Sequence, residues 1–540
     1  MNRPGPASAP EPAPRSADRC DDQSLAGIRG ALMVCGTTSN AGKSTLVAGL
    51  CRALHRGGVR VAPFKAQNMA LNSAVTSTGH EIGRAQYLQA QAAGVEPDVA
   101  MNPVLLKPTG ERSSQVVVMG KPLGVMSAVE YHEAKPELFD LVLGALADLR
   151  DRFDVVLVEG AGSPAEINLL ANDIVNLRLA DAADIPAIVV GDIDPGGVFA
   201  SLFGTVAVLP EDLRSRVKGF VINKLRGDPA LLLDGTEQLE ALSGVPTLGV
   251  VPMLENLRLD AEDSLALESP VEPNPNASLD VAVIQLPRIS NFTDIDALAL
   301  ESDLAVRFVR SARELGRPDL VVIPGSKATV ADLAWLRARG LDRAITALDH
   351  TTTVIGICAG YQMLGHHIDD DVESGDGRCA ALGLLPVNTT FAADKMLARR
   401  TGTALGRPVS GYQIHHGRVE MDADDVGAGG SASEVWLRLE DGTPDGICQG
   451  AVFGTTLHGV FDEDEFRHQF LGSVAARRGA TFSPSTRTPA RHRELELDRL
   501  ADHLAASIDL PALTLLIQSA PEPGRRGAGD PQRKKSDLAC

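Results

Sequence analysis

Short apolar runs alternate with amphipathic stretches along most of the chain, which is the pattern of an α/β protein. In the first half, nearly unbroken apolar runs stand where parallel strands covered on both faces are expected. These runs are Ala31–Cys35, Val155–Val158, Ala187–Val190, Phe220–Ile222 and Leu248–Val251. The stretch Ser44–His55 places its leucines and a valine on one helical face. The pattern therefore predicts a doubly wound sheet.

A second α/β series follows a polar, proline-containing stretch. Its apolar runs are Val281–Leu286, Leu320–Ile323, Val354–Ile357 and Val452–Thr456. Polarity rises between Glu255 and Ser278, which is the best linker candidate. We predict a disordered extension at residues 1–27, a first domain at 28–255, a linker at 256–278, a second domain at 279–505 and a largely disordered tail at 506–540.

Composition narrows the class of protein. Hydrophobic residues make up 44% of the chain and charged residues 22%, as in globular proteins. The length of 540 residues is too great for one ordinary hydrophobic core, so more than one domain is expected. The net charge of −19 and the lack of a basic stripe argue against a nucleic-acid partner. No apolar run is long enough for a bilayer and no signal-peptide pattern opens the chain, so we expect a cytoplasmic protein without a membrane partner. The seven cysteines form no Cys-x-x-Cys pair, which argues against structural zinc.

A glycine-rich loop, Gly36-Thr-Thr-Ser-Asn-Ala-Gly42-Lys43-Ser44, joins the first strand to the first helix. Such a loop points backbone N–H groups at phosphates, and the helix dipole favours the same anion. Lys43 would reach the outer phosphates of ATP and Ser44 would hold Mg²⁺. Five residues separate the two glycines, where the common pattern has four, and this longer loop resembles that of P-loop ligases such as dethiobiotin synthetase. The nucleotide-binding residues expected are Thr38, Asn40, Ala41, Gly42, Lys43, Ser44 and Thr45.

Acidic and amide side chains follow other strands. Glu159 ends a buried strand and could meet Mg²⁺ across from Ser44, although a strand-end acid can also serve only as a cap. Glu81 is a second candidate metal carboxylate. Asn223 resembles a base-recognition residue, and an ordinary polar strand end is almost as good an explanation.

The segment Phe64–Ser73 is unusually rich in polar residues for the end of an apolar stretch. Lys65 could neutralise a carboxylate or phosphate during transfer. Asn68, Asn72 and Ser73 could orient a polar ligand. Taken alone, such a segment is more often a polar loop than a site.

A second motif, Gly356-Ile-Cys358-Ala-Gly360, has the spacing of a nucleophile elbow. The N–H group of Ala359 can stabilise an oxyanion, and the strand-end loop at Gly325 and Ser326 can supply a second donor. His458 follows another strand and is the expected base, with His415 and His416 as competitors. A lone buried cysteine is usually structural, but the flanking glycines favour a nucleophile. Together, the two motifs indicate an ATP-driven ligase that takes nitrogen from glutamine.

With these motifs in hand, the chain resembles the glutamine-dependent cobyric acid synthase family from about Arg29 to Asp502. The motifs that carry the resemblance are Gly36–Ser44, Phe64–Ser73, Asn102–Pro108, Glu159–Gly162, Gly191–Gly197, Pro324–Lys327, Gly356–Gly365, Gly411–His415 and His458–Val460. It implies a dethiobiotin-synthetase-like P-loop amide ligase domain at 28–255 and a class I glutamine amidotransferase domain at 279–505. It also implies Gln362 as a glutamine-binding residue.

The resemblance implies amidation of the b, d, e and g carboxylates of adenosylcobyrinic acid a,c-diamide, with one ATP and one glutamine per amide. The implied partners are a corrinoid and glutamine, and the implied cofactors are ATP and Mg²⁺. A homodimer is a further expectation on general grounds. Many class I glutaminases continue their histidine as His-Pro-Glu, but this chain has His458-Gly459-Val460. The group that orients His458 is therefore open.

Other functions remain as alternatives. The chain could be a related amidotransferase, such as cobyrinic acid a,c-diamide synthase or a cell-wall lipid amidase, and the Gln67-Asn68-Met69 context argues against the first by resemblance. A partition-type ATPase usually has an early lysine in its glycine loop, where this chain has Thr37. A glutaminase-dead structural protein is disfavoured because Cys358 and His458 are both present.

Overall fold

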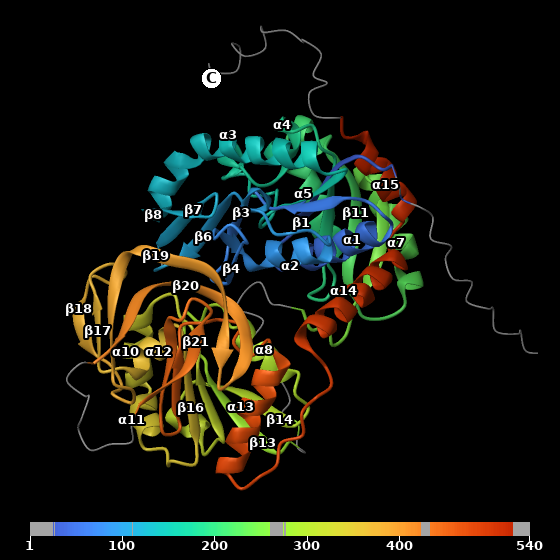
Figure 1. The fold of residues 1–540 in the computed structure, drawn as a ribbon. Coiled ribbons are helices and arrows are strands. Elements are labelled where there is room, and N and C mark those ends of the chain that lie inside the picture. Colours follow the sequence, from blue (N-terminus) through green and yellow to red (C-terminus); the bar gives the residue numbers. More distant parts are fainter. Residues whose placement is uncertain are drawn as a thin grey trace, which may run out of the picture.

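The computed structural model describes residues 25, 27–110, 112–259, 274, 277–422 and 433–521. Most of the predicted extension 1–27, most of the linker 256–278 and the tail beyond 521 lie outside these residues. The described chain forms two α/β bodies, one above the other in Figure 1. Within the described residues, no helix has the length and apolarity needed to cross a membrane.

The first body is built on a parallel sheet of six strands within the described residues. In spatial order they are β12 (Thr247–Pro252), β11 (Val217–Leu225), β10 (Ala187–Asp192), β1 (Gly30–Gly36), β9 (Val155–Glu159) and β2 (Val61–Phe64). The accompanying helices are α1 (Lys43–Arg56), α2 (Arg84–Ala92), α3 (Ala128–Arg152), α4 (Leu177–Ala182), α5 (Val198–Ala207), α6 (Glu211–Arg214) and α7 (Leu233–Ser243). The doubly wound sheet predicted for this half is confirmed.

Two small sheets lie between this parallel sheet and the second body. One contains β3 (Gln67–Met69), β6 (Val104–Pro108), β7 (Ser113–Val118) and β8 (Lys121–Ser127), and the other contains β4 (Ser73–Val75) and β5 (Glu81–Gly83). The polar Phe64–Ser73 segment therefore runs from the central sheet to the edge of the body. That edge contacts the second body, because Val75 packs with Tyr412 and Ile414.

The second body has a mixed sheet of eleven strands within the described residues. Its strands are β14 (Leu304–Val309), β13 (Leu279–Ile284), β15 (Leu320–Ile323), β16 (Thr353–Ile357), β23 (Val452–Thr455), β22 (Pro444–Gln449), β21 (Glu434–Leu439), β19 (Val387–Ala404), β17 (His367–Asp370) and β18 (Gly377–Ala380), with β20 (Arg407–Met421) paired to β19. Its helices are α8 (Thr293–Ala299), α9 (Ala312–Leu315), α10 (Thr329–Ala338), α11 (Leu341–Thr346), α12 (Ala359–Leu364) and α13 (Asp464–Arg477). In Figure 1 the β19–β20 hairpin arches toward the first body.

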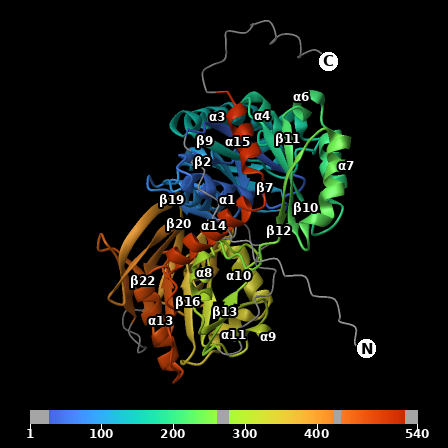
Figure 2. The same ribbon diagram turned by 90° about the vertical axis from the view of Figure 1, so that its right-hand side faces the viewer.

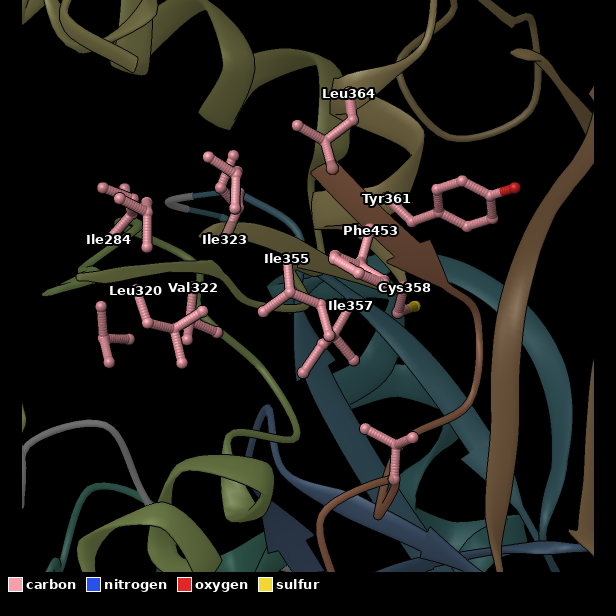
Figure 3. Packing of buried hydrophobic residues seen from close by; sticks show 14 of the residues in the cluster. Ile284, Leu320, Val322, Ile323, Ile355, Ile357, Cys358, Tyr361, Leu364 and Phe453 are labelled. Atoms are coloured by element: carbon pink, nitrogen blue, oxygen red, sulfur yellow. The ribbon is translucent and has the colours of Figure 1, made fainter. Parts of the chain in front are cut away.

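The core of the second body holds the cysteine motif in place. Strand β16 is buried at every position, and it pairs in parallel with β15 and β23. Figure 3 shows Ile355 and Ile357 packed among the neighbouring strands, with Cys358 at the end of β16. The parallel arrangement brings the carboxyl ends of these strands to one edge, where open α/β sheets bind ligands.

The last described helices return to the first body, so residues 506–521 are ordered, in contrast to the prediction of a largely disordered tail at 506–540; the rest of that tail lies outside the described residues. Helices α14 (Pro489–Ala505) and α15 (Leu510–Ser519) leave the second body and lie along the first, as Figures 1 and 2 show. Leu500, Leu504 and Ile517 are buried in the same cluster as the apolar face of α1. Burial of these side chains orders a segment whose terminal position had favoured disorder.

Removing one of these anchors should destabilise the first body. Leu500 is 2% exposed and lies against Gly49 of α1. Replacing Leu500 with alanine is expected to cost about 2–5 kcal/mol of unfolding free energy, the range for a buried leucine. Urea unfolding followed by circular dichroism should therefore show an earlier transition, while Leu495→Ala on the exposed side of α14 should leave it in place. Equal midpoints for the two variants would contradict the packing role of α14.

Candidate active sites

The cysteine site begins with a constrained turn between β16 and α12. Cys358 has φ 54° and ψ −109°, a conformation that non-glycine residues rarely adopt. A Cβ atom at Gly360 would lie 1.8 Å from the backbone oxygen of Ile323, so this position admits only glycine. The strained turn presents the buried Cys358 side chain to a small cavity at the strand end, a geometry that resembles a nucleophile elbow. Ala359 opens α12, where helical N–H groups have no partner within the helix.

His458 lies beside Cys358 and is held from several directions. Its backbone pairs with that of Tyr412, whose ring stacks on the imidazole at a centroid distance of 5.3 Å. The interaction with Cys358 contributes to the pKa of the imidazole. Gly325 is in close contact as well, because a Cβ atom there would be 2.8 Å from Cε1 of His458. The structure therefore brings together the cysteine, the histidine and the loop expected to supply an oxyanion donor.

Asp294 orients His458 and was missed by the sequence analysis. Its Oδ2 atom is 3.1 Å from Nδ1 of His458, and its Oδ1 atom accepts a 2.6 Å hydrogen bond from the N–H group of Gly459. Burial alone would lower the pKa of His458, but Cys358 and then Asp294 raise it to about 10. The sequence feature that could have pointed to Asp294 is the group of polar residues after β13, which includes Ser290 and Asn291. The missing His-Pro-Glu carboxylate is thus replaced by one from another element.

The two competing histidines lie in a different setting. His415 and His416 line the small cavity beside Cys358. Their Nδ1 atoms are hydrogen-bonded to backbone oxygens of Gly417 and Ala392, at 2.7 and 3.0 Å. Burial lowers the pKa of both, to about 4 for His415. Because the Nδ1 atoms of both bond backbone oxygens, whereas Nδ1 of His458 faces the Asp294 carboxylate, the geometry favours His458 as the base.

The remaining predicted residues of this site line the same cavity. Ser326 lies on its wall, and its hydroxyl donates to Asp332 at 2.7 Å. Gln362 is buried there too, and its Oε1 atom accepts a 3.2 Å hydrogen bond from Thr329. The Gln362 amide therefore lies in the cavity wall, with its oxygen hydrogen-bonded to Thr329.

Asp294 provides a direct test of this arrangement. Asp294→Asn retains an acceptor for Gly459 but removes the charge that supports His458. We expect the glutaminase rate constant to fall by roughly 10²- to 10⁴-fold, as when an orienting carboxylate becomes an amide. The pKa of His458 should fall as well. The imidazolium beside Cys358 would then lose its proton at lower pH, so the alkaline limb of the glutaminase pH profile would move to lower pH. Asp296→Asn on the exposed side of α8 should change neither quantity.

The phosphate loop forms the other site, between β1 and α1. Gly42 takes a left-handed conformation with φ 95°, which turns the chain into the helix. Nζ of Lys43 donates to the backbone oxygens of Thr38 at 2.8 Å and Gly162 at 3.2 Å, so it spans the loop. Thr38 and Asn40 are exposed on the loop, and Thr45 is exposed on the first turn of α1. This geometry can cradle phosphates with backbone N–H groups and one lysine.

Glu159 lies at the base of this loop. Its Oε1 atom accepts from the Ser44 hydroxyl at 2.7 Å and pairs with Nζ of Lys65 at 2.8 Å. Gln89 donates to Oε2 at 2.6 Å. A hydroxyl and a carboxylate side by side beside a phosphate loop are donors that suit Mg²⁺. Lys65 was predicted from its local context alone, and the structure places it at this point.

Asn223 and Lys224 hold the loop from the neighbouring strand. The Asn223 amide donates to the backbone oxygen of Ala41 at 2.9 Å. Lys224 donates to the backbone oxygen of Asn40 and pairs with Asp192, both at 2.7 Å. The side chain that resembled a base-recognition residue therefore supports the loop backbone in this structure.

Glu81 lies away from this loop, in contrast to its prediction as a metal ligand. Its carboxylate pairs with Lys107 at 2.7 Å and Lys395 at 2.6 Å. These lysines hold the pKa of the buried Glu81 carboxyl below its usual range, although burial acts in the opposite direction. With both oxygens engaged by ammonium groups, the Glu81 carboxylate is already neutralised.

Asn72 and Ser73 also lie between the bodies, whereas Asn68 lies deeper in the first body. Oδ1 of Asn72 accepts from the N–H group of Asn291 at 2.8 Å, and the N–H group of Ser73 donates to Oδ1 of Asn291 at 2.9 Å. Nδ2 of Asn68 donates to Gln86 at 3.0 Å. The predicted polar segment thus spans the distance from the second body to the interior of the first.

Comparisons with known proteins match both bodies. Residues 32–266 match the model of the CobQ/CobB/MinD/ParA nucleotide binding domain, and residues 280–466 match that of the CobB/CobQ-like glutamine amidotransferase domain. A cobyric acid synthase from Rhodococcus jostii is 52% identical over 505 residues, which cover 92% of this chain and 97% of that protein. A cobyric acid synthase from Nocardia farcinica is 52% identical over 515 residues, with 92% and 98% covered. One from Streptomyces coelicolor is 50% identical over 510 residues, with the same coverage.

Proposed function

The chain belongs to the cobyric acid synthase family, and on that premise we propose that it amidates the b, d, e and g carboxylates of adenosylcobyrinic acid a,c-diamide. It is an enzyme, a glutamine-dependent ligase that uses ATP. The observation that carries the proposal is the match to relatives of that name along 92% of this chain and at least 97% of theirs. The match includes both bodies and therefore both halves of the reaction.

The second body would release ammonia from glutamine. His458 would take the proton of the Cys358 thiol, and the thiolate would attack the side-chain amide carbon of glutamine. Backbone N–H groups at Ala359 and the Gly325–Ser326 loop would hold the oxyanion. His458 would return the proton to the leaving nitrogen, and water would then cleave the thioester to give glutamate and free Cys358. Asp294 would stabilise the imidazolium during these steps.

The first body would activate the corrinoid carboxylate. A carboxylate oxygen would attack the γ-phosphorus of ATP, with ADP as the leaving group, to give an acyl phosphate. Ammonia would then attack the acyl carbon and release phosphate. Lys43 and Lys65 would neutralise developing negative charge, and alignment would supply most of the acceleration.

Mg²⁺ fits the donor set at the base of the phosphate loop. Ser44 and Glu159 would hold the ion, which supplies charge neutralisation at the ATP phosphates when bound. Lys65 shares the Glu159 carboxylate and would keep it oriented. Glu81 is not part of this proposal, because its charge is matched by two lysines.

Mass spectrometry of the corrinoid product tests the proposed function. Adenosylcobyrinic acid a,c-diamide would be incubated with the protein, MgATP and glutamine. Stepwise appearance of four new amides is the expected result. An unchanged corrinoid in the presence of active glutaminase would overturn the substrate assignment, and would favour a related amidotransferase with another carboxylate substrate.

A further inference from the structure

An ion pair in the wall of the cysteine cavity has no part in the proposed mechanism. Lys327 and Glu373 of the second body line this cavity together with Cys358 and Gln362, and their side chains pair with each other. The Lys327 side chain is 7% exposed and that of Glu373 is 19% exposed. Burial of an ion pair adds little or no net stability, because the loss of hydration offsets the attraction. The pair is therefore better explained by binding than by the stability of the fold.

Lys327 directly follows the loop that is expected to hold the oxyanion. Its N–H group donates to the backbone oxygen of Arg288 at 3.0 Å, which fixes the chain at this point. Two residues later, the Thr329 hydroxyl donates to Gln362 at 3.2 Å. Oxyanion donors bind the amide end of glutamine, so a side chain on the next residue of the same loop is placed for another part of the same molecule.

Glu373 is held by a turn that a buried aspartate builds. Asp370, at the end of β17, is 1% exposed. Its carboxylate accepts hydrogen bonds from three consecutive N–H groups, those of Val372 at 3.1 Å, Glu373 at 2.7 Å and Ser374 at 3.0 Å. Hydrogen bonds of this kind from an aspartate to the following backbone fix a turn. The backbone of Glu373 is therefore fixed beside the cavity, and only its side chain must turn if its partner changes.

The cavity is too small for glutamine while the pair is closed. Its free volume is about 30 Å³, which accommodates one or two water molecules. Side chains of the wall must therefore move when glutamine reaches Cys358. The Lys327–Glu373 pair can open without leaving a charge unmatched, because the α-carboxylate and α-ammonium groups of an amino acid bring the same two charges in exchange.

The neighbouring charges favour an anion beside Lys327. Lys107 and Lys395 line the same cavity and share one carboxylate, that of Glu81. Burial lowers the pKa of Lys107 to about 8, and the charge of Lys327 acts in the same direction, although Glu81 opposes both. The ammonium groups are thus close enough to repel one another. A substrate carboxylate beside Lys327 would relieve this repulsion and replace the one that Glu373 withdraws.

We propose that Lys327 and Glu373 recognise the α-amino acid end of glutamine, with Lys327 on the α-carboxylate and Glu373 on the α-ammonium group, and that their ion pair opens when glutamine enters. Recognition of this kind rests on the proposed function, because it requires glutamine to be the substrate of Cys358. Both are specificity-determining residues, which select a free amino acid over other primary amides. When glutamate leaves, the two side chains pair again and close the cavity.

Two shortened substrates separate the two contacts. Glutaramate lacks the α-amino group of glutamine, and 4-aminobutanamide lacks the α-carboxylate. Each would leave one member of the opened pair without a partner, and an unmatched buried charge is costly. The wild-type protein should release ammonia from either amide with a kcat/KM roughly 10- to 100-fold below that for glutamine, the range for a hydrogen bond to a charged group.

Glu373→Gln should remove the preference for glutamine over glutaramate. The value of kcat/KM for glutamine should fall by roughly 10- to 100-fold, because a neutral amide cannot match the α-ammonium group. Glutaramate has no ammonium group, so its kcat/KM should not fall. The preference for glutamine over 4-aminobutanamide should persist, because Lys327 still meets the α-carboxylate. Ammonia release from each amide by the full-length protein is the measurement.

Lys327→Gln is the mirror experiment. It should remove the preference for glutamine over 4-aminobutanamide and retain the preference over glutaramate, since Glu373 still meets the α-ammonium group. The matched control is Glu465→Gln, which breaks an exposed ion pair to Arg407 of the same body. This control should leave both preferences unchanged.

Equal losses with all three amides in both folded variants would overturn the proposal, because a change in the shape of the cavity acts on every substrate. Equal use of the three amides by the wild-type protein would overturn it as well. A wild-type protein that selects glutamine but leaves the corrinoid unchanged would instead overturn the proposed corrinoid substrate, while the roles of Lys327 and Glu373 would stand. The two failures are therefore distinguishable.

Discussion

Cys358→Ala is expected to abolish glutamine-dependent amidation while amidation with ammonium chloride continues. Cys358 is the one cysteine among the described residues that line the cavity, and its strained turn presents the thiol there. Loss of a covalent nucleophile should lower glutamine-dependent turnover by roughly 10⁴-fold or more. The first body has its own loop, lysines and carboxylate and needs only ammonia. Product formation would be measured with each nitrogen source by mass spectrometry.

The alanine variant should fold normally, because the change removes one sulfur atom. Cys448→Ala on β22 is a suitable control, since this half-buried thiol lies outside the cavity. The control should use both nitrogen sources as well as the wild-type protein. Loss of ammonium-dependent activity in a folded Cys358→Ala protein would contradict the division of labour between the bodies.

Lys43→Met is expected to remove amidation with both nitrogen sources while glutamine hydrolysis persists. Lys43 is 4% exposed, and its Nζ atom spans the phosphate loop by donating to the backbone oxygens of Thr38 and Gly162. Without the Lys43 ammonium group, the negative charge that develops on the transferred phosphoryl group would lack a fixed positive partner. The rate of ATP-dependent amidation should fall by roughly 10²- to 10³-fold, as for other preorganised electrostatic groups.

The measurement would pair ADP release with glutamate release under the same conditions. Lys218→Met, an exposed lysine on β11 of the same body, should preserve both activities. Equal loss of glutaminase and synthetase activity in a folded Lys43→Met protein would mean that the sites cannot operate separately. Together with Cys358→Ala, the variant assigns one half-reaction to each body.

Local patterns in the sequence determined the α/β class, both motif-bearing turns and the positions of the central strands. Each of these depends on neighbours in the chain: apolar runs form strands, and glycines at fixed spacing permit a loop or a sharp turn. The Gly36–Ser44 loop and the Gly356–Gly360 turn are contiguous, so their chemistry could be inferred from residue types alone. Lys65 was also found in this way, as a lysine at the end of an apolar stretch.

Tertiary structure alone decided which distant groups meet. Asp294 is 164 residues before His458, and Lys395 is 314 residues after Glu81. Glu81 therefore had the local signature of a metal ligand, but the second body supplies one of the two lysines that neutralise it. The C-terminal helices are a similar case, because their apolar faces are buried against the first body, with α14 on α1 and α15 on β1. A sequence pattern encodes a residue's own element, whereas burial and charge pairing depend on what another element brings to it.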